Sequence, residues 1–186
     1  MATLTTLPAV ETTHLILREI EGRDATAFAG FMMQADYQRH IAVRLADARE
    51  VKAFVRRSVA RQGDGRRQVF HLAAEEKSSG EAVGDGFIIM QQAGLLEIGW
   101  GVHPAMWRMG LGTEIGGVLL GLGFERLKAG RMWCKVMAAN TGSAHLARRI
   151  GMRHVKSHAD YPAGEGSFTA VDIFALTAAE YFDLSY

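Results

Sequence analysis

Residues 103–117 read "HPAMWRMGLGTEIGG", and this segment is the most informative part of the chain. Gly110, Gly112 and Gly116 stand where the surrounding pattern predicts the start of a helix. Glycine costs about 1 kcal/mol relative to alanine inside a helix, so these positions need bare backbone or close packing. A glycine turn that leads into a helix presents unpaired amide N–H groups at the positive end of the helix dipole. Such a turn binds anions, most often phosphate, and we predict a phosphate site from Arg108 to Thr113.

Two familiar phosphate motifs fit this segment poorly. A P-loop requires a Gly-Lys pair followed by Ser or Thr, and the sequence contains no such triplet. A dinucleotide-binding fingerprint is a closer rival, but its first glycine should follow the strand directly. Here "HPAMWRM" separates Val102 from Gly110. That fingerprint also needs an acidic residue about 20 positions further on, and residues 127–159 contain no Asp or Glu.

The composition limits the class of protein. A length of 186 residues with 48% hydrophobic residues fits one globular domain with a substantial core. The net charge of +1 argues against a protein that coats nucleic acid. The single cysteine, Cys134, excludes an internal disulfide, and we expect it to be buried. The chain has no signal-peptide pattern and no apolar run of about 18 residues, so we expect a cytoplasmic protein without a membrane partner.

Hydrophobic periodicity predicts one mixed α/β domain over residues 13–186, after a loose leader at residues 1–12. The order of the elements favours helices packed on one central sheet. Strands are expected at residues 14–20, 68–76, 82–91, 94–102, 131–138, 152–159 and 167–176, and helices at residues 24–33, 47–62, 111–129 and 140–150.

The segment around residue 110 resembles motif A of the GCN5-related N-acetyltransferase (GNAT) family, whose pattern is [Q/R]-x-x-G-x-[G/A]. Three further segments resemble the branch that includes the ribosomal-protein N-terminal acetyltransferases: "THLILREI" (13–20), "NTGSAHLARRIGMRHV" (140–155) and "VDIFAL" (171–176). The resemblance implies a GNAT-type mixed, mostly antiparallel sheet of about six or seven strands with about four helices. It also implies a V-shaped splay between the strands at residues 94–102 and 131–138. One position departs from the motif, since Trp107 stands where Gln or Arg is commoner.

The resemblance implies that acetyl-CoA is the donor and that no metal is needed. Backbone N–H near Val102 would polarise the thioester carbonyl, as in an oxyanion hole. Asn140 and Ser143 would contact the coenzyme, although Asn140 could equally cap the helix that follows it. The loop that would hold the pyrophosphate consists of Arg108, Met109, Gly110, Leu111, Gly112 and Thr113.

The chemistry also needs an acid and a base. Many family members use a tyrosine to protonate the departing thiolate, but Ala147 occupies that position here. Some members of the ribosomal branch use a serine instead, and Ser143 matches it. An acceptor amine must lose a proton before it attacks, and Glu97 is the candidate base. Its place between Leu96 and Ile98 puts its carboxylate on the same strand face as Gly99 and Gly101, although a structural ion pair is the alternative role.

We therefore predict an N-acetyltransferase that moves an acetyl group to a primary amine by direct attack in a ternary complex. The acceptor would be a protein N-terminus or a small molecule, no nucleic acid is involved, and a homodimer remains open. A non-catalytic module that binds acyl-CoA is the alternative, because Ala147 removes the usual acid. A nicotinamide-dependent oxidoreductase is disfavoured by the poor match to the dinucleotide fingerprint.

Overall fold

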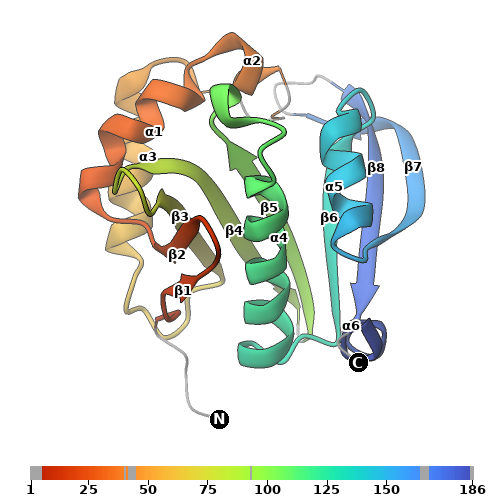
Figure 1. The fold of residues 1–186 in the computed structure, drawn as a ribbon. Coiled ribbons are helices and arrows are strands. Elements are labelled where there is room, and N and C mark those ends of the chain that lie inside the picture. Colours follow the sequence, from red (N-terminus) through yellow and green to blue (C-terminus); the bar gives the residue numbers. More distant parts are fainter. Residues whose placement is uncertain (1–5, 40, 42–44, 93, 164–167, 185–186) are drawn as a thin grey trace.

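The computed structural model describes residues 6–39, 41, 45–92, 94–163 and 168–184. Within these residues, eight strands form one sheet in the order β1-β2-β3-β4-β5-β6-β8-β7 (Figure 1). The strands are β1 Val10–Glu11, β2 Leu15–Glu19, β3 Val69–Glu76, β4 Ala82–Gln92, β5 Leu95–Val102, β6 Arg131–Met137, β7 Arg153–Pro162 and β8 Phe168–Thr177. The helices are α1 Ala25–Met32, α2 Ala35–Gln38, α3 Ala48–Ala60, α4 Leu111–Gly121, α5 Thr141–Arg149 and α6 Ala178–Leu184.

Every pair of neighbouring strands is antiparallel except β5 and β6, which run parallel. Their ladder is short: it joins Leu95 to Arg131, Leu96 to Met132 and Glu97 to Trp133, and then ends. Beyond Glu97 the two strands separate. The strand directions confirm the mostly antiparallel sheet that the family resemblance implied. The end of this ladder confirms the splay between residues 94–102 and 131–138.

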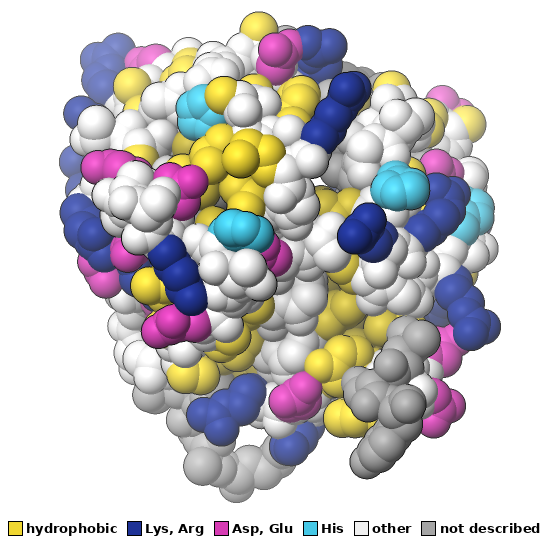
Figure 2. All heavy atoms as spheres, in the orientation of Figure 1, with side chains coloured by type: hydrophobic (Ala, Val, Ile, Leu, Met, Phe, Trp, Pro, Cys, Tyr) yellow, Lys and Arg dark blue, Asp and Glu magenta, His cyan; other side chains and the backbone are white. Residues whose placement is uncertain are grey.

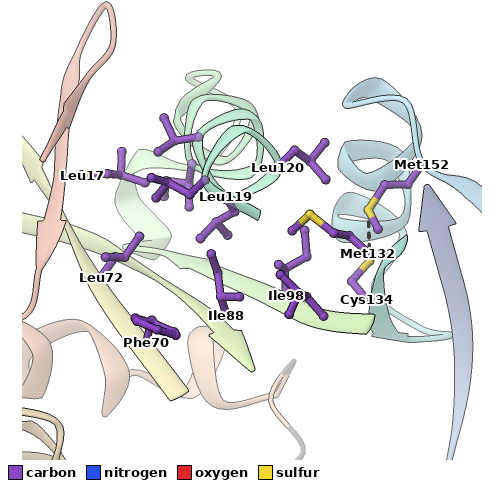
Figure 3. Close-up of a cluster of buried hydrophobic side chains, with 14 of the residues drawn as sticks. Leu17, Phe70, Leu72, Ile88, Ile98, Leu119, Leu120, Met132, Cys134 and Met152 are labelled. Carbon is purple, nitrogen blue, oxygen red and sulfur yellow. Dashed lines mark hydrogen bonds between the residues drawn. The ribbon is translucent and has the colours of Figure 1, made fainter. Parts of the chain in front are cut away.

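Helix α4 fills one face of the sheet on either side of the opening. Its buried side chains, Leu119 and Leu120 among them, meet residues of five neighbouring strands (Figure 3). On those strands the core residues are Leu17, Leu72, Ile88, Ile98 and Met132. Cys134 is buried in the same cluster, and burial is the main cause that raises the pKa of its thiol to about 12. The cysteine is therefore a core residue, as the sequence predicted.

The opposite face carries a second core under α1 and α3 (Figure 1). Helix α3 begins at Asp47, whose carboxylate accepts the backbone N–H groups of Arg49 and Glu50. Its apolar stripe buries Val51 and Val55 against the sheet, while the polar stripe faces solvent. Helices thus cover both faces of the sheet, with α4 packed on one face of β5 and α1 and α3 over the strands that precede it.

The segment expected to be a loose leader contributes to the fold. Residues 1–5 lie outside the described residues, but Leu7 is buried and Val10 pairs with Leu17 in the short strand β1. Thr12 and His14 bind the carboxylate of Glu114, which lies in the first turn of α4. Strand β1 was not predicted, because two residues are too few to show an alternating pattern. It also explains why the sheet has more strands than expected.

The helices differ from those predicted at one boundary and by two additional short helices. Helix α4 ends at Gly121 and continues as a π-helical turn, Leu122–Arg126, instead of running to residue 129. Gly123 in this turn allows the side chain of Met132 to approach, since an added Cβ would collide with it. The short helices α2 and α6 were not expected, because four to seven residues carry little periodicity.

One histidine is enclosed between α3 and the sheet. The His71 Nδ1 lies 3.0 Å from Ser58 Oγ, and its imidazole packs against the rings of Phe54 and Phe87. Burial is the main cause that lowers the pKa of His71 to about 4, and the charge of Arg61 acts in the same direction. The folded protein therefore holds this imidazole neutral at neutral pH.

Stability should consequently fall as the pH drops from about 6.5 to about 4, because the unfolded chain binds a proton that the folded imidazole does not. His71→Gln removes this titration. Denaturant unfolding at several pH values should show that the wild type loses up to about 3 kcal/mol more than the variant across this range. Parallel curves for the two proteins would mean that His71 titrates normally in the fold.

Candidate active site

The loop between β5 and α4 has an unusual backbone. After a turn at Pro104–Met106, Arg108 adopts a φ of 67° and Gly110 a φ of 86°, both in the left-handed region. Glycine reaches this region without strain, whereas a residue with a side chain such as Arg108 does so at a cost of about 1 kcal/mol. The indole N–H of Trp107 donates to the carbonyl of Val102 at 2.9 Å. The loop is thus fixed to the end of β5 by a residue that departs from the family motif.

These dihedral angles expose a row of donors. No side chain caps α4 at Gly110, and among the described residues the amide N–H groups of residues 108–112 have no protein acceptor. The first intrahelical bond runs from Thr113 N to Gly110 O at 2.9 Å. Free amides at the start of a helix attract an anion, and a phosphate can satisfy several of them at once. The predicted phosphate loop therefore has the donors that its role requires.

Different physical requirements explain the glycines at positions 110, 112 and 116. A Cβ on Gly110 would meet no atom within 4 Å, so its left-handed conformation is the reason for glycine there. A Cβ on Gly112 would collide with the side chain of Leu146 on α5. Gly116 likewise faces Ile150 and Leu146. At Gly112 the structure thus gives close packing of α4 against α5, rather than phosphate access alone, as the reason for a missing side chain.

The edge of β5 beyond Glu97 is also available to a ligand. His103 N donates to Val83 O at 2.8 Å, across the ladder toward β4. Neighbouring residues of a strand direct their N–H groups to opposite edges, so the N–H of Val102 points away from β4, toward the side of β6. Strand β6 does not pair with β5 beyond Glu97. The N–H of Val102 is therefore directed toward the opening between the two strands.

Asn140 and Ser143 lie together at the start of α5. The Asn140 side chain accepts the backbone N–H of Ser143 at 3.0 Å, so it caps the helix. Ser143 is partly exposed and precedes Leu146 by one helical turn on the same face. Because Leu146 packs against Gly112, the Ser143 hydroxyl belongs to the same end of the molecule as the glycine loop. Ala147, at the position of the family tyrosine, is completely buried.

Glu97 stands where β5 and β6 part, with both carboxylate oxygens engaged. It accepts a hydrogen bond from Gln91 Nε2 at 2.8 Å and lies 3.3 Å from Lys135 Nζ. Its exposed fraction is 7%. The Lys135 ammonium also approaches the rings of Trp133 and Tyr161. Glu97 therefore has the ion pair that the sequence left open as its alternative role, with a lysine as partner.

The strand face that Glu97 shares with Gly99 and Gly101 is more crowded than the sequence suggested. A Cβ on Gly99 would collide with the ring of Phe87. A Cβ on Gly101 would collide with the hydroxyl of Tyr37 and with the carboxylate of Asp85. The two glycines make room for these side chains. Sequence reasoning missed Tyr37 and Asp85; the alternating Gly99 and Gly101 on one strand face were the only sign that something approaches β5 there.

The outer surface adds little long-range charge. Acidic and basic side chains are interspersed over the face that shows α4 and α5 (Figure 2). No group of three or more metal-ligating side chains occurs among the described residues. Within the same residues, no helix combines the length and the apolar character that a membrane span requires.

The loop, the open strand edge and the helix that follows correspond to the architecture of a known enzyme family. Residues 14–153 match the family described as "Acetyltransferase (GNAT) domain". The chain belongs to the GNAT family. As a GNAT protein it is an acetyl-CoA-dependent acetyltransferase. The matched residues include β5, the glycine loop, α4 and α5, so every part of the candidate site lies within the family domain.

Similar proteins agree with this assignment. An uncharacterized N-acetyltransferase of Bacillus licheniformis, p20, is 25% identical over 173 residues, which cover 91% of this GNAT chain and 96% of p20. A GNAT-family acetyltransferase from Bacillus anthracis has a similar fold, with a TM-score of 0.82, 18% identity, and coverage of 92% and 99%. A ribosomal L7/L12 α-N-protein acetyltransferase in complex with coenzyme A gives a TM-score of 0.79 at 15% identity, with coverage of 91% and 98%.

The packing at Gly112 leads to a testable expectation. Gly112→Val should lower the free energy of unfolding by about 1–3 kcal/mol, because the new side chain overpacks the contact with Leu146. Leu146→Ala in the same protein should recover part of this loss. Gly117→Ala is the matched control, because its Cβ would meet nothing within 4 Å. Denaturant unfolding measures all three; weaker acetyl-CoA binding at unchanged stability would instead show that the glycine serves the phosphate.

Proposed function

We propose that this GNAT protein transfers the acetyl group of acetyl-CoA to the primary amine of a protein N-terminus or of a small molecule. The amine attacks directly while donor and acceptor are bound together. The chief support is the separation of β5 from β6 after Glu97 and Trp133, beside a helix whose first amides are unpartnered. We further propose that residues 13–186, together with the short strand β1 that pairs with β2, form a single domain that carries this activity.

The residues around the opening fit acetyl-CoA, which supplies the acetyl group as an activated thioester. The amides from Arg108 to Thr113 would hold the pyrophosphate, and the Arg108 side chain adds a positive charge to this loop. The N–H of Val102 would donate to the thioester carbonyl oxygen and stabilise negative charge that develops on it. Apart from Thr113 N, which already donates to Gly110 O, the backbone donors in these roles either lack an acceptor among the described residues or point away from β4.

Ser143 is the proposed acid. Ala147 is buried and has no hydroxyl to donate. Ser143, in contrast, has a hydroxyl and is partly exposed at the start of α5. Its O–H would donate to the coenzyme sulfur as negative charge builds there. Asn140 would contribute mainly by fixing the first turn of α5, and thus the position of Ser143.

Glu97 remains the base that the sequence predicts. In the structure its carboxylate already binds Gln91 and Lys135, so an acceptor amine would be its third partner. Its support is its place at the last residue pair before the strands part.

The activity can be tested with the whole chain. Calorimetry should detect binding of acetyl-CoA and no binding of NADPH. A screen of peptide N-termini, polyamines, aminoglycosides and amino acids should then find acceptors that cause release of free thiol. Binding of acetyl-CoA without thiol release by any amine would count against amine acetylation and favour a module that only binds acyl-CoA.

A second experiment concerns Ser143. If its hydroxyl protonates the leaving thiolate, Ser143→Ala should lower kcat at least about tenfold and leave the affinity for acetyl-CoA nearly unchanged. His145→Ala is the matched control, because it removes an exposed side chain from the same helix and should retain kcat. Normal turnover of the folded Ser143→Ala protein would leave Ser143 as part of the helix cap only.

A further inference from the structure

A hydroxyl and a carboxylate meet beside the last residues of β5. Tyr37 on α2 donates its phenolic hydrogen to Asp85 Oδ1 on β4 at 2.7 Å. Asp85 is the register partner of Gly101, and both polar groups occupy the space that a side chain at Gly101 would fill. The pair therefore lies on the face of β5 opposite α4, one residue before Val102.

The surroundings of Asp85 are those of a proton acceptor. Burial is the main cause that raises the pKa of its carboxyl to about 6, while the hydrogen bond from Tyr37 acts in the opposite direction. The residue nevertheless remains partly exposed. A poorly solvated carboxylate accepts a proton more readily than an ordinary surface carboxylate.

Tyr37 is suited to pass a proton rather than to lose one. Burial and the neighbouring Asp85 raise the pKa of Tyr37 well above its ordinary value. Its hydroxyl can receive a proton on oxygen only as it delivers its own to Asp85. Of the other titratable groups described on this face, Glu97 on β5 is paired with Lys135, and His71 on β3 is kept neutral by burial. His103, directly after β5, packs against Phe31 beside Tyr37.

Contacts on the same side hold α2 over the end of β5. Gln34, which precedes α2, lies with its Nε2 3.3 Å from His103 Nε2. The ring of Phe31 packs against both His103 and Tyr37. His103 is followed directly by the turn that leads to the glycine loop. The pair is thus fixed relative to the strand whose opposite edge and loop would hold acetyl-CoA.

We propose that Tyr37 and Asp85 remove the proton from the acceptor ammonium, with Tyr37 as the residue that contacts the amine and Asp85 as the final acceptor. This inference rests on the proposed function. Asp85 suits the role better than Glu97, because its one described side-chain partner is a hydroxyl that can relay a proton, whereas Glu97 is paired with the ammonium of Lys135.

The proton balance is complete. One ammonium proton moves to Tyr37 Oη while the Tyr37 hydroxyl proton moves to Asp85, which leaves a neutral amine and a neutral carboxylic acid. The amine lone pair then forms the nitrogen–carbon bond to the acetyl group as the carbon–sulfur electron pair leaves on sulfur. Ser143 gives its hydroxyl proton to sulfur and regains a proton from the second one lost by nitrogen, and Asp85 returns its proton to solvent after the amide departs.

The experiment uses Asp85→Asn and Tyr37→Phe in the full chain, with the best amine from the screen. At pH 7 each variant should lose about 10²-fold or more in kcat/KM, while calorimetry shows unchanged affinity for acetyl-CoA. The pH–rate profile of the wild type should include a rise with a midpoint near 6, and this rise should disappear in Asp85→Asn. Raising the pH should recover part of the activity of both variants, because free amine then forms without assistance.

A readout independent of turnover tests the pair itself. Carbon-13 NMR of the Asp85 carboxyl should show a titration midpoint near 6 in the wild type, and a higher midpoint in Tyr37→Phe, because the stabilising hydrogen bond to the carboxylate is gone. Asp36→Asn is the matched control, since it removes a carboxylate from the same helix at an exposed ion pair with Arg39. It should leave the rate profile unchanged.

The outcomes separate the two proposals. Wild-type turnover with superimposable profiles for Asp85→Asn and Tyr37→Phe would overturn the relay and leave the acetyltransferase activity intact. If Glu97→Gln alone removed the rise near pH 6, the base would be Glu97, and the relay would again be wrong. Absence of thiol release by the wild type with every amine would overturn amine acetylation and, with it, the relay.

Discussion

The short parallel ladder between β5 and β6 is the constraint on which the rest of the molecule depends. Three residue pairs join the strands before they diverge. A longer ladder would satisfy the inner edges of both strands and leave no backbone donor for a ligand. A missing ladder would divide the sheet into two halves. The ladder of three pairs keeps one continuous sheet and leaves the edge of β5 unpaired at Val102.

The packing of α4 makes this arrangement stable. The helix lies beside the opening and buries Leu119 and Leu120 against strands on both sides of it (Figure 3). Its own start is held by Glu114, which binds Thr12 and His14 near the first strands. The free amides that precede the helix are therefore presented by a rigid element. A flexible loop would lose this preorganisation and bind an anion less tightly.

The two faces of β5 have different chemical characters. The side toward α4 is apolar and ends in a loop of backbone donors, which suits a phosphate-bearing coenzyme. The opposite side carries three ionisable groups, Glu97, Lys135 and Asp85, from three neighbouring strands. A donor and an acceptor could thus approach the same strand from different sides, and only the strand edge would separate them. This division is the structural basis for the proposed direct transfer in a ternary complex.

The sequence by itself determined the class of fold, the order of most elements, the glycine loop and the family. These features depend on local signals: hydrophobic periodicity, helix caps and the spacing of glycines within about 20 residues. Short elements such as β1 and α2 lacked enough residues to produce a period.

Only the tertiary structure decided which partner each carboxylate meets. Glu97 meets Lys135 across the point where the strands part, and Asp85 meets Tyr37 from a helix 48 residues earlier in the chain. Such contacts depend on strand register and on the position of α2 over the end of β5. Neither leaves a periodic trace in the sequence, because the free energy of a buried charge is set by its spatial neighbours rather than by its neighbours along the chain.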